Sequence, residues 1–205
     1  MKTVIQRVKS ASVTVDGQRV SEIGRGILIL AGIGKDDTPK EAESMAAKIL
    51  KVKLWDDDEG GKWKKNVQEI DGEVLCVSQF TLYATTKKGN KPDFHKSAPA
   101  AKAKELYDTF FGQVRKLYRE DRVKDGIFQA MMDVGLVNDG PVSEEMPTTP
   151  RFGVDFTSLD EAVTIEIETN PPEMPNPSGL QDPKEGEVFQ GKMKRTFEYP
   201  ASLLE

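Results

Sequence analysis

The chain has 205 residues, of which 37% are apolar and 31% charged, and its formal net charge is −5. This composition indicates a folded domain with one substantial core, and the acidic balance argues against capture of nucleic acid by overall charge, although it leaves room for a local basic patch. A single cysteine, Cys76, excludes an intramolecular disulfide, and no apolar run has the length of a membrane span, so we expect a cytoplasmic protein without a membrane partner.

The first 36 or so residues are predicted to form strands. Apolar and polar residues alternate between Val4 and Val15, and Asp16-Gly17 is typical of a two-residue hairpin turn. The apolar run 26–33 predicts a central strand. Its flanking glycines have the spacing of neither a phosphate-binding loop nor a dinucleotide fingerprint, so we interpret them as strand ends. These glycines are Gly24, Gly26, Gly32 and Gly34.

Two helices are predicted. Thr38-Pro39-Lys40-Glu41 is a capping box with proline at the first helical position, and apolar residues follow it at helical spacing to Leu50. The second helix is expected from Pro99 to Tyr118, where a stripe of apolar residues recurs every three or four positions.

Further strands are predicted at 74–83, 131–137 and 162–169. Strands flank both helices without a regular alternation of strand and helix. The fold class is therefore α+β with a largely antiparallel or mixed sheet.

A boundary is expected after residue 169. The segment 170–205 contains six of the twelve prolines and little apolar content, which predicts an unstructured tail or one that docks on the domain or a partner. The polar stretch 144–161 is interpreted as an insertion between two strands. The expected organisation is a domain over 1–169, followed by the tail.

Few side chains suit catalysis. One histidine and one cysteine exclude a metal cage with several histidines, and we expect no metal or other cofactor. Cys76 lies in an apolar strand, which is typical of an inert core thiol. His95 lies in a lysine-rich loop, where a solvated side chain is favoured over a catalytic base.

Two polar motifs follow apolar segments. Ser78-Gln79-Phe80-Thr81 can line a pocket and polarise a carbonyl through its backbone N–H groups, or can form hydrogen bonds at a strand end. Thr81 as a nucleophile would need a nearby base, and the sequence suggests none. Asn138-Asp139-Gly140-Pro141 is either an ordinary turn or a rigid corner whose bare backbone approaches a ligand closely.

Together these two motifs resemble the D-aminoacyl-tRNA deacylase family, and their order and separation match it. The likeness covers 1–143 and resumes at 163–169, whereas 144–161 and 170–205 fall outside the family's compact domain. The other segments that carry the likeness are Gln6-Arg7-Val8, residues 11–17, Gly126-x-Phe128 and Ala130-x-Met132.

The resemblance implies a barrel-like sheet with two main helices, and a homodimer with active sites at the subunit interface. It implies hydrolysis of the ester between a D-amino acid and the tRNA 3′ end, as proofreading in translation, with glycyl-tRNA, including that mischarged on tRNA for alanine, as a second substrate. It also implies that no side-chain nucleophile is indispensable and that the terminal 2′-hydroxyl of the tRNA takes part.

The resemblance also assigns roles by position. The backbone of Gln79, Phe80 and Thr81 would orient and polarise the ester, and a cis Gly140-Pro141 bond would hold the substrate's α-amino group so that an L side chain is rejected. Asn138 and Ser78 would contribute to substrate binding. Arg7 would brace the Gly-Pro loop, and Met132 would lie near the adenosine pocket. The candidates for phosphate contacts are Lys87, Lys88, Lys91 and Lys96.

Gln129 departs from the family, in which we expect a small residue, usually glycine. We expect its longer side chain to change the shape of the adenosine pocket. Two other functions stay open at this point: a non-catalytic protein that binds tRNA or other nucleic acid, and an esterase with Thr81 or Ser78 as nucleophile.

Overall fold

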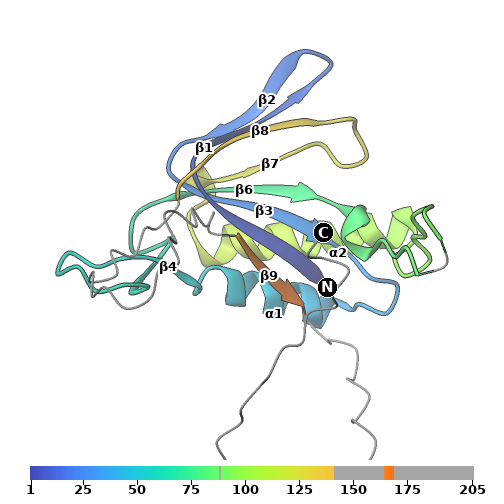
Figure 1. Ribbon diagram of the computed structural model, residues 1–205, viewed down its shortest axis with the longest axis horizontal. Coiled ribbons are helices and arrows are strands. Elements are labelled where there is room, and N and C mark those ends of the chain that lie inside the picture. The colour runs from blue at the N-terminus through green and yellow to red at the C-terminus, as the bar shows by residue number, and fades with distance from the viewer. Residues whose placement is uncertain (88, 141–163, 169–205) are drawn as a thin grey trace, which may run out of the picture. The chain divides into compact units, whose positions relative to one another are not determined.

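The computed structural model describes residues 1–87, 89–140 and 164–168 (Figure 1). The predicted insertion lies outside these residues, as do the tail and Pro141. The described elements are β1 (Lys2–Val15), β2 (Gln18–Ile23), β3 (Gly26–Gly32), α1 (Pro39–Ile49), β4 (Lys53–Trp55), β5 (Lys65–Asn66), β6 (Glu73–Ser78), the 3-10 turn η1 (Phe80–Tyr83), α2 (Ala100–Leu117), the 3-10 turn η2 (Glu120–Arg122), β7 (Val123–Asp125), β8 (Asp133–Asn138) and β9 (Thr164–Glu168).

The long strand β1 organises a mixed sheet that is nearly closed into a barrel. Its N-terminal half pairs with β3 and β9, and its C-terminal half pairs with β2 and β8, all antiparallel. Strands β3, β6 and β7 are mutually parallel, because α1 and α2 lie in the connections between them. The prediction of an α+β fold with a mixed sheet is confirmed, and so is the turn at Asp16-Gly17, where both residues have positive φ.

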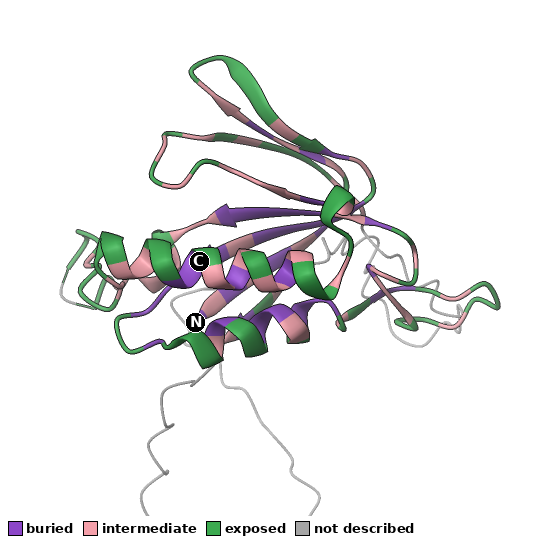
Figure 2. Cartoon of the chain, turned by 180° about the vertical axis from the view of Figure 1, so that it is seen from behind, coloured by how far each residue is buried: buried purple, intermediate pink, exposed green. Residues whose placement is uncertain are grey.

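Both helices cover one face of the sheet, side by side (Figure 2). The predicted capping box is present, with Glu41 accepting from the Thr38 N–H at 2.9 Å. Each helix buries most of the stripe that its periodicity predicts, but Leu117 at the end of α2 is exposed, where the periodicity predicted burial, and Ala103 is only partly buried. The buried residues are Ala42, Met45, Ala46 and Ile49 in α1, and Leu106, Tyr107, Phe110 and Val114 in α2.

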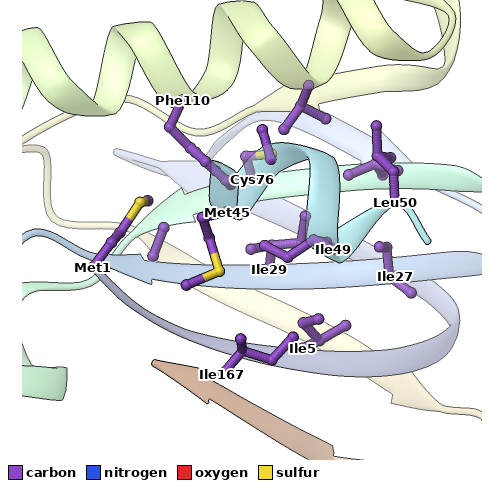
Figure 3. Packing of buried hydrophobic residues seen from close by; sticks show 14 of the residues in the cluster. Met1, Ile5, Ile27, Ile29, Met45, Ile49, Leu50, Cys76, Phe110 and Ile167 are labelled. Atoms are coloured by element: carbon purple, nitrogen blue, oxygen red, sulfur yellow. The ribbon is translucent and has the colours of Figure 1, made fainter. Parts of the chain in front are cut away.

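The apolar run in β3 is buried on both faces. Ile27 and Ile29 point to the helices and pack with Met45 and Phe110 (Figure 3), whereas Leu28 belongs to a second cluster on the opposite face. A strand that is covered on both sides is apolar at every position, which explains why this segment lacks alternation. Cys76 is part of the helix-side cluster, and burial raises the pKa of its thiol, in agreement with an inert core residue.

Two strands differ from their predicted bounds. The strand expected over 74–83 ends at Ser78, and Phe80–Tyr83 turns into η1, with the Leu82 N–H donating to the Gln79 carbonyl at 3.3 Å. A short apolar run has the same composition in a strand and in a 3-10 turn, so the sequence alone could not distinguish the two conformations. The strand expected at 131–137 occupies Asp133–Asn138. Of the last expected strand, 162–169, the structure describes Thr164–Glu168, which form β9. None of the described helices is long and apolar enough to cross a membrane.

Candidate active site

A cavity of about 680 Å³ lies where β3 and β6 end. Its wall is formed by those strand ends, by η1, by the segment that enters α2, and by the segment 128–134. Representative lining residues are Val77, Phe80, Phe94, Ala100, Phe128 and Met132. Among the described residues that line it, none carries an ionisable side chain, so its polar groups are hydroxyls, amides and backbone.

The predicted catalytic motif forms one edge of this cavity. Ser78, Gln79 and Phe80 line it, and the Gln79 side-chain amide donates to the Thr81 hydroxyl. The N–H groups of Phe80 and Thr81 precede the first hydrogen bond of η1, and within the described part of the chain they donate to no protein group. They are therefore free to donate to a bound carbonyl or oxyanion.

Two glycines let η1 lie directly on the end of β3. A Cβ atom on Gly32 would lie 3.0 Å from the Gln79 carbonyl oxygen, and one on Gly34 would lie 2.8 Å from the Tyr83 hydroxyl. The Gln79 N–H also donates to the carbonyl of Ala31 at 2.8 Å. The close approach of two backbone segments explains these glycines, which the sequence suggested only as strand ends.

Asp37 links the end of β3 to η1. Its buried carboxylate accepts from the N-terminal ammonium of Met1, from the Gly34 N–H at 2.6 Å, and from the Tyr83 hydroxyl at 3.5 Å. Burial, and then the charge of Asp37, raise the pKa of Tyr83 above its usual value of 10.0. Tyr83, the last residue of η1, is thus held protonated against Asp37.

Aromatic side chains form the rim of the cavity. Phe80 is 59% exposed and packs edge-on against Phe94, with ring centroids 5.1 Å apart. The hydroxyl of Ser97 donates to the Phe80 carbonyl at 3.1 Å, which ties η1 to the segment that enters α2. Exposed ring faces beside a pocket suit stacking of a nucleobase.

The opposite wall of the cavity contains Met132. Its sulfur accepts from the Ile127 N–H at 3.4 Å, and a Cβ atom on Gly126 would lie 2.7 Å from that sulfur. Gln129 has φ of 65°, in the left-handed region. That backbone conformation explains why glycine is expected at this position, and Gln129 adopts it while lining the cavity.

Arg7 lies in a different part of the molecule and holds Asp139. It is 8% exposed, and its Nε donates to the Asp139 carbonyl at 2.8 Å, while its Nη1 donates to the Leu54 carbonyl at 2.6 Å. The Asp139 N–H donates back to the Arg7 carbonyl at 3.0 Å, and the Gln6 amide donates to the Asn138 side chain. The backbone directly before Gly140 is therefore fixed from two sides.

Within one chain, Arg7 and the backbone before Gly140 do not lie next to η1. Arg7 pairs with Ile27 near the start of β3, whereas Gln79 bonds to Ala31, four residues further along. Four strand residues span about 13 Å. In Figure 1, β8 runs away from the η1 end of the sheet toward the opposite end, where Asp139 and Gly140 follow it.

The lysine loop lies next to η1. Lys87, Lys91 and Lys96 are exposed, and Lys88 is outside the described residues. His95 is also exposed, and its Nδ1 lies 2.6 Å from an Asp93 carboxylate oxygen. Over the described residues, no group of three histidine, cysteine or acidic side chains is arranged to hold a metal ion.

Several residues that shape the site were not identified from the sequence. Asp37 and Phe94 have no motif of their own, and Gly34 was interpreted only by its position at a strand end. The described cavity lining contains no histidine or acid that a sequence motif could reveal. The contacts of Asp37 with Met1 and of Gly34 with Tyr83 join residues more than 30 positions apart, so no local pattern predicts them. Tyr83 ended the predicted strand 74–83 and Phe94 lay in the lysine-rich loop, but neither residue was given a role.

Comparison with known proteins identifies close relatives. The family model described as D-Tyr-tRNA(Tyr) deacylase matches residues 4–146. A D-aminoacyl-tRNA deacylase of Yarrowia lipolytica is 53% identical over 150 residues, which are 72% of this chain and 97% of that protein. Human D-aminoacyl-tRNA deacylase 1 is 51% identical over 146 residues, covering 71% of this chain and 69% of the human protein.

Solved structures agree on the fold. The structure titled c-Myc DNA unwinding element binding protein is 46% identical, with a TM-score of 0.69, and the match covers 82% of this chain and 99% of that one. A probable eukaryotic D-amino acid tRNA deacylase matches with a TM-score of 0.56 at 18% identity, over 66% of this chain and 92% of that one.

Proposed function

The chain belongs to the D-Tyr-tRNA(Tyr) deacylase family and is a D-aminoacyl-tRNA deacylase, an enzyme that acts on aminoacyl-tRNA, and we propose that its cavity binds the terminal adenosine with the ester against η1. The reaction is a proofreading step of translation. The observation that carries the mechanism is a pocket whose described lining has no ionisable side chain and whose edge presents the N–H groups of Phe80 and Thr81, which have no acceptor among the described residues.

The proposed chemistry relies on backbone and on the substrate. Water attacks the ester carbonyl, and the N–H groups of Phe80 and Thr81 donate to the oxyanion that forms. The C–O bond to the ribose then breaks, the 3′ oxygen takes a proton, and the free amino acid leaves. The adjacent 2′-hydroxyl of the tRNA positions the water and relays the proton, a task for which the described pocket lining has no acid or base.

We further propose that the chiral filter comes from a second copy of the chain. Arg7 and Gly140 lie too far from η1 to contact the same ester, so the pocket of one subunit would be completed by Gly140 and Pro141 of the partner subunit. Exposed apolar residues on β8 and beside it support a homodimer. They are Leu136, which is 45% exposed, Val137, which is 53% exposed, and Met131, which is 91% exposed.

This filter would select by rejection. Rigid backbone at Gly140-Pro141 would bind the α-amino group and occupy the volume that an L side chain needs, while a D side chain would point outward. Glycine has no side chain to exclude, so glycyl-tRNA, including that mischarged on tRNA for alanine, is proposed as a second substrate in the cytoplasm.

Hydrolysis of D-tyrosyl-tRNA and L-tyrosyl-tRNA by the purified chain tests the function. We expect release of the D-amino acid and a rate at least about 100-fold lower on the L substrate, because exclusion by backbone is steric. Equal rates on both substrates would contradict the proposed filter, and no release from the D substrate would contradict the activity.

The variant Thr81→Ala distinguishes the proposed mechanism from that of an esterase with a side-chain nucleophile. Since the Thr81 hydroxyl accepts from Gln79 and has no adjacent base among the described residues, we expect the variant to keep its rate within about fivefold. A substrate with a 2′-deoxy terminal ribose should instead react far more slowly. Complete loss in Thr81→Ala with an unaffected 2′-deoxy substrate would favour the nucleophile.

A non-catalytic role in DNA binding is the second candidate. It is suggested by the 46% identical structure, whose title names a DNA unwinding element binding protein. This role would be supported if the unmutated chain bound duplex DNA at physiological salt and hydrolysed no ester. Activity on D-aminoacyl-tRNA without DNA binding would exclude it.

A further inference from the structure

Three lysines from separate segments meet beside the cavity. Lys35 follows β3, Lys96 precedes α2, and Lys102 lies in the first turn of α2. The Lys35 N–H donates to the Lys96 carbonyl at 3.0 Å, and the Lys102 ammonium donates to the Lys35 carbonyl at 2.6 Å. We call Lys35, Lys96 and Lys102 the three-lysine surface.

This surface borders the mouth of the cavity. The chain between Lys96 and Lys102 contains Ser97 and Ala100, which line the cavity, and Ser97 is bonded to the carbonyl of Phe80. The loops that leave β3 and β6 lie at the same end of the sheet (Figure 1). A polynucleotide whose last nucleoside enters the cavity would therefore pass these lysines.

The charges of the surface are available to a partner. Lys35 and Lys96 are exposed, Lys102 is half-buried, and none of the three forms an ion pair with any of the residues that the structure describes. Two acidic residues of the neighbouring segments are paired with other groups, Asp37 with the N-terminal ammonium and Asp108 with Lys104.

The exposed Asp36 next to Lys35 is the acid that offsets part of this charge. The surface therefore remains positive by about two charges at neutral pH. On a chain whose net charge is −5, a positive patch at the cavity mouth runs against the overall balance.

We propose that the three-lysine surface binds the backbone phosphates of the tRNA acceptor end, a partner that rests on the proposed function. Ammonium groups on flexible stems contact phosphates as point charges and release counterions, so they give affinity and position without reading sequence. Lys35 and Lys102 are assigned to this role by the fold alone, because they are 61 and 6 residues from Lys96 in the chain.

Equilibrium binding of uncharged tRNA, measured by fluorescence anisotropy over a range of salt concentrations, tests the surface without requiring catalysis. The test variant replaces Lys35, Lys96 and Lys102 with glutamine. The matched control replaces Lys48, Lys51 and Lys116, which are exposed and in no ion pair with described residues, and so makes the same change in net charge. Lys116 lies about 21 Å from Lys102 along α2.

We expect the test variant to bind tRNA about tenfold more weakly at 0.1 M salt, and the slope of log affinity against log salt to become shallower by about 2. The control should keep both values near those of the unmutated chain. Equal affinities and slopes for the two variants would overturn the proposal.

A small substrate distinguishes a failure of the three-lysine surface from a failure of the proposed function. D-tyrosyl-adenosine contains the ester and the nucleoside but none of the tRNA phosphates. We expect the test variant to hydrolyse it at the unmutated rate. If the unmutated chain releases no amino acid from D-tyrosyl-tRNA and yet binds tRNA through these lysines, the proposed function fails and the surface stands.

Discussion

The end of the sheet that contains the cavity and the end that contains Gly140 differ in their polar groups. At the cavity, the described lining has no ionisable side chain, and the N–H groups of Phe80 and Thr81 donate to no protein group among the described residues. At the other end, a buried guanidinium binds two carbonyls and the Asp139 carboxylate, and both the N–H and the carbonyl of Asp139 are hydrogen-bonded.

This difference indicates two tasks. Unbonded N–H groups suit a charge that appears only during a reaction, whereas a saturated, rigid backbone suits the exclusion of a shape. We interpret the cavity end as the part that performs hydrolysis and the Arg7 end as the part that selects the substrate, and variants at the two ends should therefore have different effects.

The largest effect is expected for Arg7→Met. Methionine keeps much of the apolar stem but loses the bonds to the Asp139 and Leu54 carbonyls, which leaves buried acceptors unpaired and frees the Gly140 loop. We expect the free energy of unfolding to fall by about 3 kcal/mol and the D-to-L ratio of kcat/KM to collapse. Urea denaturation and the paired tyrosyl-tRNA assay measure the two.

Arg19→Met is its control, because Arg19 is exposed and its ion pair with Glu22 should contribute little. An unchanged D-to-L ratio in a folded Arg7→Met protein would show that the two ends do not divide the work in this way.

Gly34→Ala should have the next largest effect, at the cavity end. The added methyl group would lie 2.8 Å from the Tyr83 hydroxyl and would displace η1. We expect kcat to fall about tenfold, with KM and the D-to-L ratio nearly unchanged, because the selecting end is untouched.

Gly112→Ala, at a helical position with open space, is the matched control and should be neutral or slightly stabilising. A Gly34→Ala variant that loses D-selectivity instead of kcat would contradict the division between the two ends.

A smaller effect is expected at alkaline pH. Because burial and Asp37 raise the pKa of Tyr83 above 10.0, the unfolded chain loses this proton before the folded chain does. The stability that this tyrosine contributes is complete below pH 10 and is lost as the pH rises above it. Tyr83→Phe should reduce that loss by on the order of 1 kcal/mol, after allowing for solvent screening of a half-exposed ring.

Urea denaturation of Tyr83→Phe and the unmutated chain at pH 8 and pH 11 measures this difference. The same alkaline loss in both proteins would show that Tyr83 is not held protonated against Asp37.

Much of the fold could be predicted because its patterns are local. The capping box at Thr38 and the period-two alternation around Val4 depend on neighbouring residues only. The end of β6 could not be predicted, since the residues of η1 would also suit a strand and the turn is imposed by the approach to Gly32 and Gly34.

For the site, the two motifs could be identified from the sequence, but the distance between them in the folded chain could not. The distance between Arg7 and Gln79 follows from the register of β1 on β3, which no local pattern specifies. The role of Asp37 has the same origin, as does the meeting of Lys35 with Lys96 and Lys102, because each joins segments that are distant in sequence.

A heterodimer of two defective chains tests the central claim most directly. Gly34→Ala and Arg7→Met chains carrying different tags would be co-expressed, and the mixed dimer isolated by both tags. If each site combines the cavity of one subunit with the Gly140 loop of its partner, one of the two sites has no defect, and D-specific activity should return to about half of the unmutated value. A mixed dimer whose rates on D- and L-tyrosyl-tRNA are only the average of those of the two parent dimers would contradict the account, because each site would then consist of a single chain.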